Sequence, residues 1–210
     1  MEHKCGKTDP KALFKIGYGL YLVTSKDGEN ENGMIVNTVI QVKNDPVTLA
    51  VTINKGAYSH ELIKNTGKLV VHCLDKNTPF EFFENFGFHS GRDYDKFKKY
   101  GAIRSENGLP LVAERFVNAV FQLKVVNYVD LDTHGMFICD VECSAVFSLE
   151  DSITYDFYHK HVKPQNNIPK EESKGFVCTV CGYIHKGDEL PPDIVCPICR
   201  HGAEVFEKIK

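Results

Sequence analysis

Residues 116–147 read FVNAVFQLKVVNYVDLDTHGMFICDVECSAVF. The stretch is rich in valine, isoleucine and phenylalanine, and a polar connection divides it, so it predicts strands at Phe116–Val129 and Met136–Phe147. Similar segments earlier in the chain predict strands at Leu20–Ser25, Met34–Val42, Val47–Ile53 and Lys68–Leu74. Two turn signals, Asp27-Gly28 and Asn32-Gly33, bracket the connection between the first two of these strands.

Helices are few in the predicted order. We expect a short helix at 10–17 that opens on Pro10, a helix at about 57–66 that ends at Gly67, and shorter turns around 79–86 and 92–100. Strands and helices do not alternate regularly, which favours an antiparallel barrel over a doubly wound sheet. No Gly-x-Gly-x-x-Gly follows a strand and no Walker A loop is present, so the sequence contains no Rossmann-type or P-loop motif that would indicate nucleotide binding.

The composition is that of an ordinary folded protein, with 42% apolar and 25% charged residues among 210. The 25 Lys and Arg residues stand against 28 Asp and Glu, so no overall basic field attracts nucleic acid. No apolar run reaches the roughly 18–20 residues of a membrane span. The first residues, Met1–Lys4, lack the apolar stretch of a signal peptide. We therefore expect a cytoplasmic protein with neither a membrane nor a nucleic acid as partner.

The eight cysteines fall into two classes. Four are scattered and are expected to be small buried residues: Cys5, Cys73, Cys139 and Cys143. The others form two pairs, Cys178-Thr-Val-Cys181 and Cys196-Pro-Ile-Cys199, with fourteen residues between them. Two such pairs can close a four-sulfur shell around one metal ion. The alternative is two disulfides in a small stapled domain, which suits a secreted chain.

A polar segment precedes these pairs. Residues 159–174 contain two prolines and no aromatic residue, which is typical of a linker. The part that follows is too small to fold on its apolar core, so a bound metal would supply most of its folding free energy. The predicted organisation is a domain at 1–160, a linker at 161–174 and a small domain at 175–210.

Cysteine spacing alone leaves zinc and iron open. Gly182 follows the first pair and can bring a backbone N–H close to a sulfur. The segments Phe176–Tyr183 and Cys196–Cys199, with Phe206, resemble a rubredoxin of the compact type found at the tail of rubrerythrins. Arg200 departs from the glycine that many rubredoxins have there. The resemblance implies one iron held by Cys178, Cys181, Cys196 and Cys199, and a structural zinc ribbon is the alternative.

The larger part of the chain, over about 10–160, resembles the flavin-reductase family. The matching segments are Ile16–Ser25, Gly33–Gln41, Asp45-Pro46, Ser90–Asp93 and Asp132–Val141. The resemblance implies a mainly β fold, an FMN-binding split β-barrel with Greek-key order and few helices. With its rubredoxin-like metal-knuckle domain, the whole chain resembles the high-molecular-weight rubredoxins. Cys139 stands where the family usually has glycine, and its thiol would narrow the space near a flavin.

Several polar residues are candidates for the cofactor site. Asn37 and Thr38 break an apolar strand, and the resemblance implies that they bind the edge of the flavin ring. Four others surround the start of the predicted helix, a natural seat for phosphate, and the family assigns them to the phosphate and ribityl chain of FMN: Asn54, Lys55, Ser59 and His60. The alternatives are a polar outer face of a strand for the first pair and a helix cap at Ser59.

A loop and a turn supply the remaining candidates. The loop combines an aromatic ring, a hydroxyl, a glycine whose backbone can approach a ligand closely, and a guanidinium that can bind two phosphate oxygens. These residues are Phe86, Ser90, Gly91 and Arg92. His134, between Asp132 and the strand from Met136, is the candidate catalytic residue beside the nicotinamide. A surface turn and a solvated histidine are the respective alternatives.

The resemblance implies an oxidoreductase of electron transport, a flavoprotein that takes hydride from NADH or NADPH and passes electrons singly from FMN to the iron. A flavodiiron protein that reduces dioxygen or nitric oxide is the implied acceptor. Because the cofactor carries the chemistry, no general base is expected. A homodimer is expected, since related barrels build the FMN site with a second subunit. Two other functions stay open: a binding module with a zinc ribbon, and a flavin reductase with a structural zinc tail.

Overall fold

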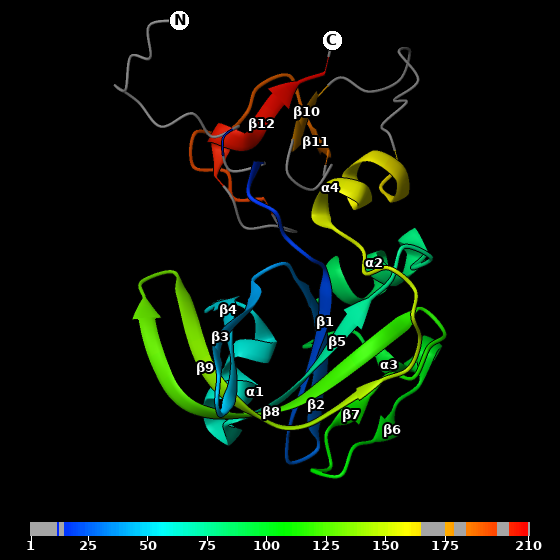
Figure 1. Ribbon diagram of the computed structural model, residues 1–210. Helices are drawn as coiled ribbons and strands as arrows, with labels where there is room; N and C mark the ends of the chain where they lie inside the picture. The colour runs from blue at the N-terminus through cyan, green and yellow to red at the C-terminus, as the bar shows by residue number, and fades with distance from the viewer. Residues whose placement is uncertain (1–11, 13–14, 165–174, 179–183, 197–201, 210) are drawn as a thin grey trace, which may run out of the picture. The chain divides into compact units, whose positions relative to one another are not determined.

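The computed structural model describes residues 12, 15–164, 175–178, 184–196 and 202–209 (Figure 1). The chain divides into two compact units, the N-terminal unit Met1–Lys163 and the C-terminal unit Pro164–Lys210. Among the residues described, no helix has the length and apolar character that a membrane crossing needs.

The N-terminal unit is built on an antiparallel sheet of seven strands in the order β2-β1-β5-β8-β9-β4-β3 (Figure 1). The predicted mainly β fold with few helices is confirmed. The two long strands expected from residues 116–147 are β8 and β9, which pair with each other along nearly their whole length. The strands are β1 Tyr21–Asp27, β2 Asn30–Val36, β3 Val39–Asn44, β4 Val47–Asn54, β5 Lys68–Leu74, β8 Val117–Leu131 and β9 His134–Val146.

The sheet curls around an inner core. Its two edge strands, β2 and β3, follow each other directly in the chain, and Val36 and Val39 from these strands belong to the same buried cluster. Alternate residues of each strand point into this cluster, as the pleat of a strand requires. The inner core consists of Val23, Val36, Val39, Leu49, Val51, Ile53, Ile63, Leu69, Val71, Leu123, Phe137 and Cys139.

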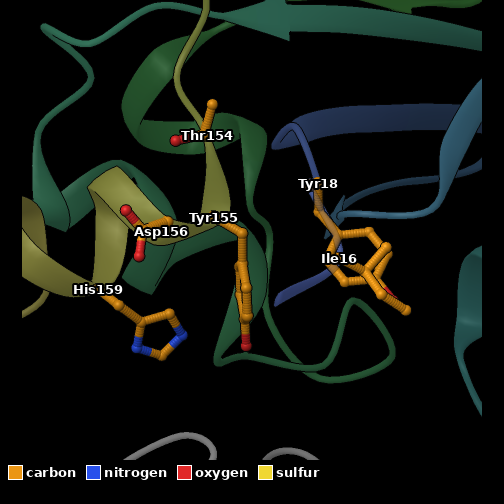
Figure 2. A pocket seen from close by; sticks show the side chains of 7 residues that line it. Ile16, Tyr18, Thr154, Tyr155, Asp156 and His159 are labelled. Atoms are coloured by element: carbon orange, nitrogen blue, oxygen red, sulfur yellow. The ribbon is translucent and has the colours of Figure 1, made fainter. Parts of the chain in front are cut away.

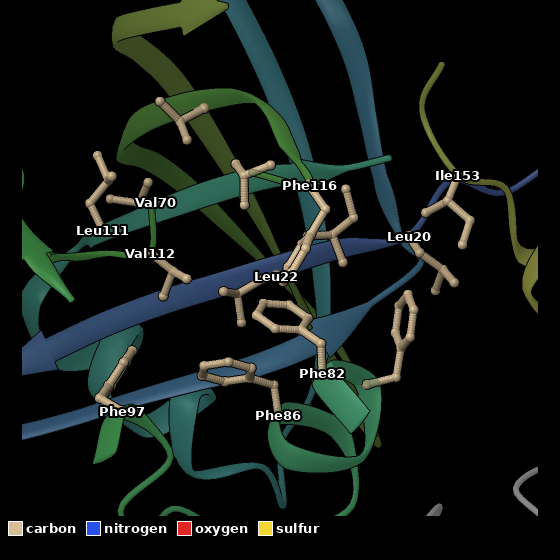
Figure 3. Packing of buried hydrophobic residues seen from close by; sticks show 14 of the residues in the cluster. Leu20, Leu22, Val70, Phe82, Phe86, Phe97, Leu111, Val112, Phe116 and Ile153 are labelled. Carbon is tan, nitrogen blue, oxygen red and sulfur yellow. The ribbon is translucent and has the colours of Figure 1, made fainter. Parts of the chain in front are cut away.

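A second, outer core covers the other face of β1, β5 and β8 (Figure 3). Helices α2 (Phe80–Gly87) and α3 (Phe97–Tyr100) contribute most of its aromatic rings. Phe82 is central, with ring centroids 4.7 Å from Phe86 and 4.8 Å from Phe116. Both faces of β5 are therefore buried, which explains why its sequence, KLVVHCL, is apolar on both sides instead of alternating. A short two-stranded sheet, β6 (Ile103–Arg104) and β7 (Pro110–Leu111), lies along the chain between α3 and β8.

The strand expected at Met34–Val42 is two strands instead of one. The chain breaks at Asn37 and Thr38, where it passes from one edge of the curled sheet to the other. Thr38 holds this corner against β4, because its hydroxyl donates to the carbonyl of Thr52 (2.5 Å) and its carbonyl accepts from the Thr52 amide (3.0 Å). The earlier turn is also tighter than expected: Gly28, with φ +58°, lets β2 begin at Asn30.

Helix α1 (Tyr58–Thr66) confirms the helix expected at about 57–66. Gly67 ends it with φ +67° and donates its amide to the Ile63 carbonyl at 2.8 Å. Half of the helix expected at 10–17, residues 10, 11, 13 and 14, lies outside the described residues. The N-terminal unit ends in a short helix, α4 (Tyr155–Phe157), that continues as the π-helix η2 (Tyr158–Val162), so residues 161 and 162 of the expected linker are helical.

The C-terminal unit contains a three-stranded antiparallel sheet in the order β11-β10-β12. Its elements are β10 (Gly175–Cys178), β11 (Ile184–Lys186), the 3₁₀ helix η3 (Ala203–Val205) and β12 (Phe206–Lys208). The buried cluster described in this unit is small, and it contains Cys178, Cys196 and Phe206. Among the residues described in this unit, few apolar side chains are buried together, and a small unit of this kind is expected to need a metal to fold.

Candidate functional site

One group of predicted residues meets where α1 begins. Asn32 of β2 donates its side-chain amide to the Ser59 hydroxyl of α1 at 3.0 Å. Gly91 of the loop after α2 packs on the same amide, because a Cβ at Gly91 would lie 2.1 Å from Asn32 Oδ1. We call Asn32, Ser59, Gly91 and Arg92 the Asn32 corner. It joins three segments that are distant in the sequence.

Arg92 places a positive charge at this corner. Its guanidinium donates to the Glu61 carboxylate at 2.7 Å and lies 4.6 Å from the centroid of the Tyr58 ring. The Ser90 hydroxyl accepts the Arg92 amide at 3.2 Å, which shapes the loop. Helix α1 begins without a side-chain cap at Ala57, so Ser59 does not serve as its cap. A helix start, the exposed Ser90 hydroxyl and a guanidinium suit an anionic group, which would compete with Glu61 for Arg92, whereas Ser59 is fully buried.

A second group lies where β4 ends and β9 begins. Asn54 and His134 are register partners across these two strands. Lys55 donates its amide to the Thr133 carbonyl at 3.0 Å and pairs its ammonium with Asp130 at 2.5 Å. That pairing raises the pKa of Lys55 and lowers the pKa of Asp130. His134 is half-buried, and its Nδ1 lies 2.9 Å from the Thr133 hydroxyl.

The corner at Asn37 and Thr38 shares one face with this second group. Thr38 precedes Val39, whose register partner on β4 is Val51, and both valines belong to the inner core, so Thr38 faces the other side, as Thr52 does. The inner-core residues of β4 are Leu49, Val51 and Ile53, so Thr52 and Asn54 point outward. The structure therefore brings Thr38, Asn54 and His134 to the outer face of the barrel.

Two predicted cofactor ligands have positions that do not support that role. Phe86 is fully buried in the outer core, with its ring centroid 5.8 Å from Phe97. His60 is 9% exposed and faces inward: its ring packs on Phe137, and its Nε2 lies 3.2 Å from the Tyr128 hydroxyl. Burial lowers the pKa of His60. Both side chains are packing residues because the elements that carry them turn these faces into the core.

Two residues that shape the site carry no local signal in the sequence, Asn32 and Lys96. Asn32 reads as an ordinary turn residue, and its contact with Ser59 exists only because β2 starts earlier than expected. Lys96 is 4% exposed and donates its ammonium to the carbonyls of Gly33 and Phe86, both at 2.8 Å. Burial lowers the pKa of Lys96 to about 8, so it stays mostly charged at neutral pH. No sequence signal separates this lysine from its neighbours Lys98 and Lys99.

A cavity of about 250 Å³ lies elsewhere in the N-terminal unit (Figure 2). Residues before β1 and residues around α4 line it, among them Tyr18, Tyr155 and His159. None of the residues assigned to the cofactor from the sequence belongs to this lining. The cavity is therefore separate from both polar groups.

Of the scattered cysteines that the structure describes, Cys139 is buried as expected, whereas Cys73 and Cys143 are half-buried. Cys178 and Cys196 are both fully buried and share one cluster in the C-terminal unit, while Cys181 and Cys199 lie outside the described residues. Thiolates enclosed by apolar side chains are soft ligands with water excluded, which fits an iron or zinc ion. In the N-terminal unit, burial raises the pKa of Cys73 to about 11 and that of Cys139 to about 12. Cys139 lies in the inner core and is a structural residue there.

Known proteins match both units. Residues 13–164 match the family described as flavin reductase like domain, and residues 176–207 match the rubrerythrin, rubredoxin-like domain. The high molecular weight rubredoxin of Moorella thermoacetica is 35% identical, with 96% of this chain and 100% of that protein covered. The ferric-chelate reductase (NAD(P)H) of Archaeoglobus fulgidus is 37% identical, with 72% of this chain and 89% of that protein covered.

A solved structure shows the same fold. The NADH:FAD oxidoreductase SgcE6 of Streptomyces globisporus C-1027 superposes with a TM-score of 0.64 at 19% identity. The superposition covers 71% of this chain and 92% of that chain.

Proposed function

The chain belongs to the flavin reductase-like domain family and carries a rubrerythrin-type, rubredoxin-like domain, and from this premise we propose that it oxidises NADH or NADPH and passes the electrons through FMN to iron. As a member of this family it is an oxidoreductase. The observation that carries the proposal is that one chain holds a flavin-type barrel and four paired cysteines. A protein acceptor, a flavodiiron protein that reduces dioxygen or nitric oxide, completes the proposed route. The proposal places the protein in the cytoplasm, where thiols stay reduced.

The two polar groups support an FMN seat with distinct ends. Beside the Asn32 corner, Ser90 and an Arg92 released from Glu61 would hold the phosphate, because a helix start and a guanidinium favour dianionic oxygens, while Ser59 is fully buried. On the outer face, Asn37, Thr38 and Asn54 would donate to and accept from the edge of the flavin ring. FMN, when bound, accepts two electrons as a hydride and releases them one at a time.

His134 would orient the nicotinamide. It is half-buried beside Asn54, at the open end of β4 and β9, where a second ring could lie over a flavin. His134 would position the hydride donor. Hydride transfer requires that a carbon of the nicotinamide approach a nitrogen of the flavin closely, and it requires no strong base.

The four paired cysteines would hold the iron. Cys178 and Cys196 are enclosed in the C-terminal unit, and Cys181 and Cys199 complete the donor set in the sequence. Iron in such a site carries one electron at a time, and burial of the sulfurs sets its reduction potential.

A homodimer is part of the proposal. The outer face of β3, β4, β9 and β8 carries a row of register partners, Ile40, Ala50 and Ile138, and a second row that ends in Met136 and Val129. Ile40 is 62% exposed and Val129 is 40% exposed. This apolar strip adjoins Thr38, Asn54 and His134, so a second subunit that covered it would also enclose the flavin seat.

A visible spectrum of the purified chain tests the electron route. We expect flavin bands together with the red bands of ferric thiolate, and NADH should bleach both. A colourless chain loaded with zinc would overturn the electron route and leave a flavin reductase with a structural metal.

Removal of one iron ligand separates the two steps. Cys181→Ser should leave the bleaching of flavin by NADH intact, because the barrel does not use this residue, and should abolish reduction of the protein acceptor. Equal loss of both activities would show that the two centres do not act in series.

A further inference from the structure

We propose that Glu61 sets how strongly the chain prefers FMN over riboflavin, because it holds the Arg92 guanidinium that the flavin phosphate must take over. The inference rests on the proposed function and adds to it a residue that determines specificity. Glu61 lies in the first turn of α1, and Arg92 lies on the loop after α2, so tertiary packing brings the two charges together.

The Glu61–Arg92 ion pair is accessible to a ligand. Arg92 Nη2 lies 2.7 Å from Glu61 Oε2, and the side chains of Arg92 and Glu61 are 50% and 52% exposed. Among the residues that the structure describes, neither side chain has a second ion-pair partner. An exposed pair of this kind is weak, because water and salt screen both charges. An anion with more negative charge than a carboxylate can therefore displace Glu61.

The backbone that carries Arg92 is held in place by contacts other than Glu61. Gly91 packs on the buried side-chain amide of Asn32, where a Cβ at Gly91 would overlap Asn32 Oδ1. The Ser90 hydroxyl accepts the Arg92 amide at 3.2 Å. Release from Glu61 would therefore free the guanidinium while the loop keeps its place beside α1.

The ring of Tyr58 gives the guanidinium a second support. The Cζ atom of Arg92 lies 4.6 Å from the centroid of this ring, and Tyr58 is the half-buried first residue of α1. The face of the ring attracts the positive charge and occupies none of the five N–H donors of the guanidinium. A phosphate can therefore replace Glu61 at these N–H groups while the contact with Tyr58 remains.

The exchange gains only the difference between two anions. The Glu61 carboxylate carries one negative charge, and a phosphate monoester carries about 1.5 to 2 at pH 7. FMN must displace Glu61 to reach Arg92, so Glu61 lowers the affinity for FMN. Riboflavin has no phosphate and does not compete for Arg92. The charge of Glu61 thus limits the preference for FMN.

Two flavins that differ only in the phosphate test the proposal. The full-length chain, freed of flavin, is titrated with FMN and with riboflavin. Glu61→Gln keeps the shape of the side chain and removes its charge, so we expect the dissociation constant for FMN to fall about two- to fivefold while that for riboflavin stays unchanged. Arg92→Gln should raise the constant for FMN alone. Once Arg92 is replaced, Glu61→Gln should have no further effect, because Glu61 acts through Arg92.

The ion pair of Glu81 and Lys99 supplies a matched control. Its atoms lie 2.9 Å apart, and the side chains of Glu81 and Lys99 are 70% and 51% exposed. Like Glu61, Glu81 lies in the first turn of its helix. Glu81→Gln should leave both dissociation constants as they are in the wild type. An equal gain in FMN affinity in Glu81→Gln would overturn the proposal, because the net charge of the chain would then set the affinity.

The outcomes separate the inference from the proposed function. A wild-type chain that binds neither flavin overturns the proposed function. A wild-type chain that prefers FMN, with a dissociation constant for FMN that stays the same or rises in Glu61→Gln, overturns the inference alone. An equal shift for both flavins in Glu61→Gln also overturns it, because Glu61 would then be a structural residue. A gain that persists in full on the Arg92→Gln background overturns it as well, since Glu61 would then repel the phosphate directly.

Discussion

At the scale of single residues, His72 shows how a polar group is accommodated between two cores. Its ring is fully buried on β5, Nδ1 donates to the Leu22 carbonyl at 3.1 Å, and Nε2 accepts the Val112 amide at 3.1 Å. Both nitrogens are satisfied only in the neutral ring, because a charged ring has no acceptor to offer Val112. Burial accordingly lowers the pKa of His72 to about 4.

This neutral histidine makes stability depend on pH. Its pKa in the folded chain lies below the ordinary value of 6.5, so the unfolded chain binds the proton first as pH falls. The contribution is fully present above pH 6.5 and is lost between pH 6.5 and about 4, for a loss of about 3 kcal/mol. Urea unfolding followed by circular dichroism at a series of pH values measures it.

The variant His72→Gln should flatten this dependence on pH, at some cost in stability at pH 7. The exposed His89 supplies the control, since His89→Gln should leave the slope as it is in the wild type. An unchanged slope in His72→Gln would show that another group causes the loss of stability.

At the scale of elements, Lys96 ties three segments together. Its ammonium bonds to the Phe86 carbonyl in the last turn of α2 and to the Gly33 carbonyl on β2. The last carbonyls of a helix have no partner within the helix, and a cation there also complements the helix dipole. The carbonyl of Lys96 accepts from Asn85 Nδ2 at 2.9 Å, which secures the far end of the loop that carries Ser90 and Arg92.

Replacement of Lys96 should therefore loosen that loop. Lys96→Met keeps the apolar stem but leaves two buried carbonyls without a donor, and we expect a loss of about 1–3 kcal/mol in the free energy of unfolding. Amides in 88–95 should exchange with deuterium faster, while those of β8 and β9 exchange as before. Lys98→Met, at an exposed position two residues away, is the matched control. Unchanged deuterium exchange of the amides in 88–95 would show that the Lys96 hydrogen bonds do not hold this loop.

At the scale of the whole molecule, the proposed dimer depends on the apolar strip of the outer face. Ile40→Glu places a charge in the middle of this strip, so we expect a monomer by light scattering and a weaker affinity for FMN. Leu149→Glu is the control, because Leu149 is 99% exposed and lies outside the sheet. A variant Ile40→Glu that remains dimeric would place the interface elsewhere.

Much of the architecture could be predicted from local patterns. The long strands β8 and β9, helix α1 with its stop at Gly67, and the two cysteine pairs all depend on signals within a few residues of each other. The break at Asn37 and Thr38 could not be predicted, because it depends on where the curled sheet brings β3 against β4. Burial of a side chain also depends on tertiary packing, so the sequence alone places Phe86 and His60 among the cofactor ligands although both face a core.

Residue types and their spacing establish the chemistry that this chain can hold: four paired thiols in a small unit, and a mainly β barrel with the motifs of a flavin reductase. Such motifs act through residue type and spacing, which the sequence states directly. Which polar side chains lie together depends instead on tertiary packing. Asn32, Ser59 and Gly91 are distant along the chain, and packing of β2, α1 and a loop brings them into contact. Contacts of that kind depend on register and burial, which no local pattern encodes.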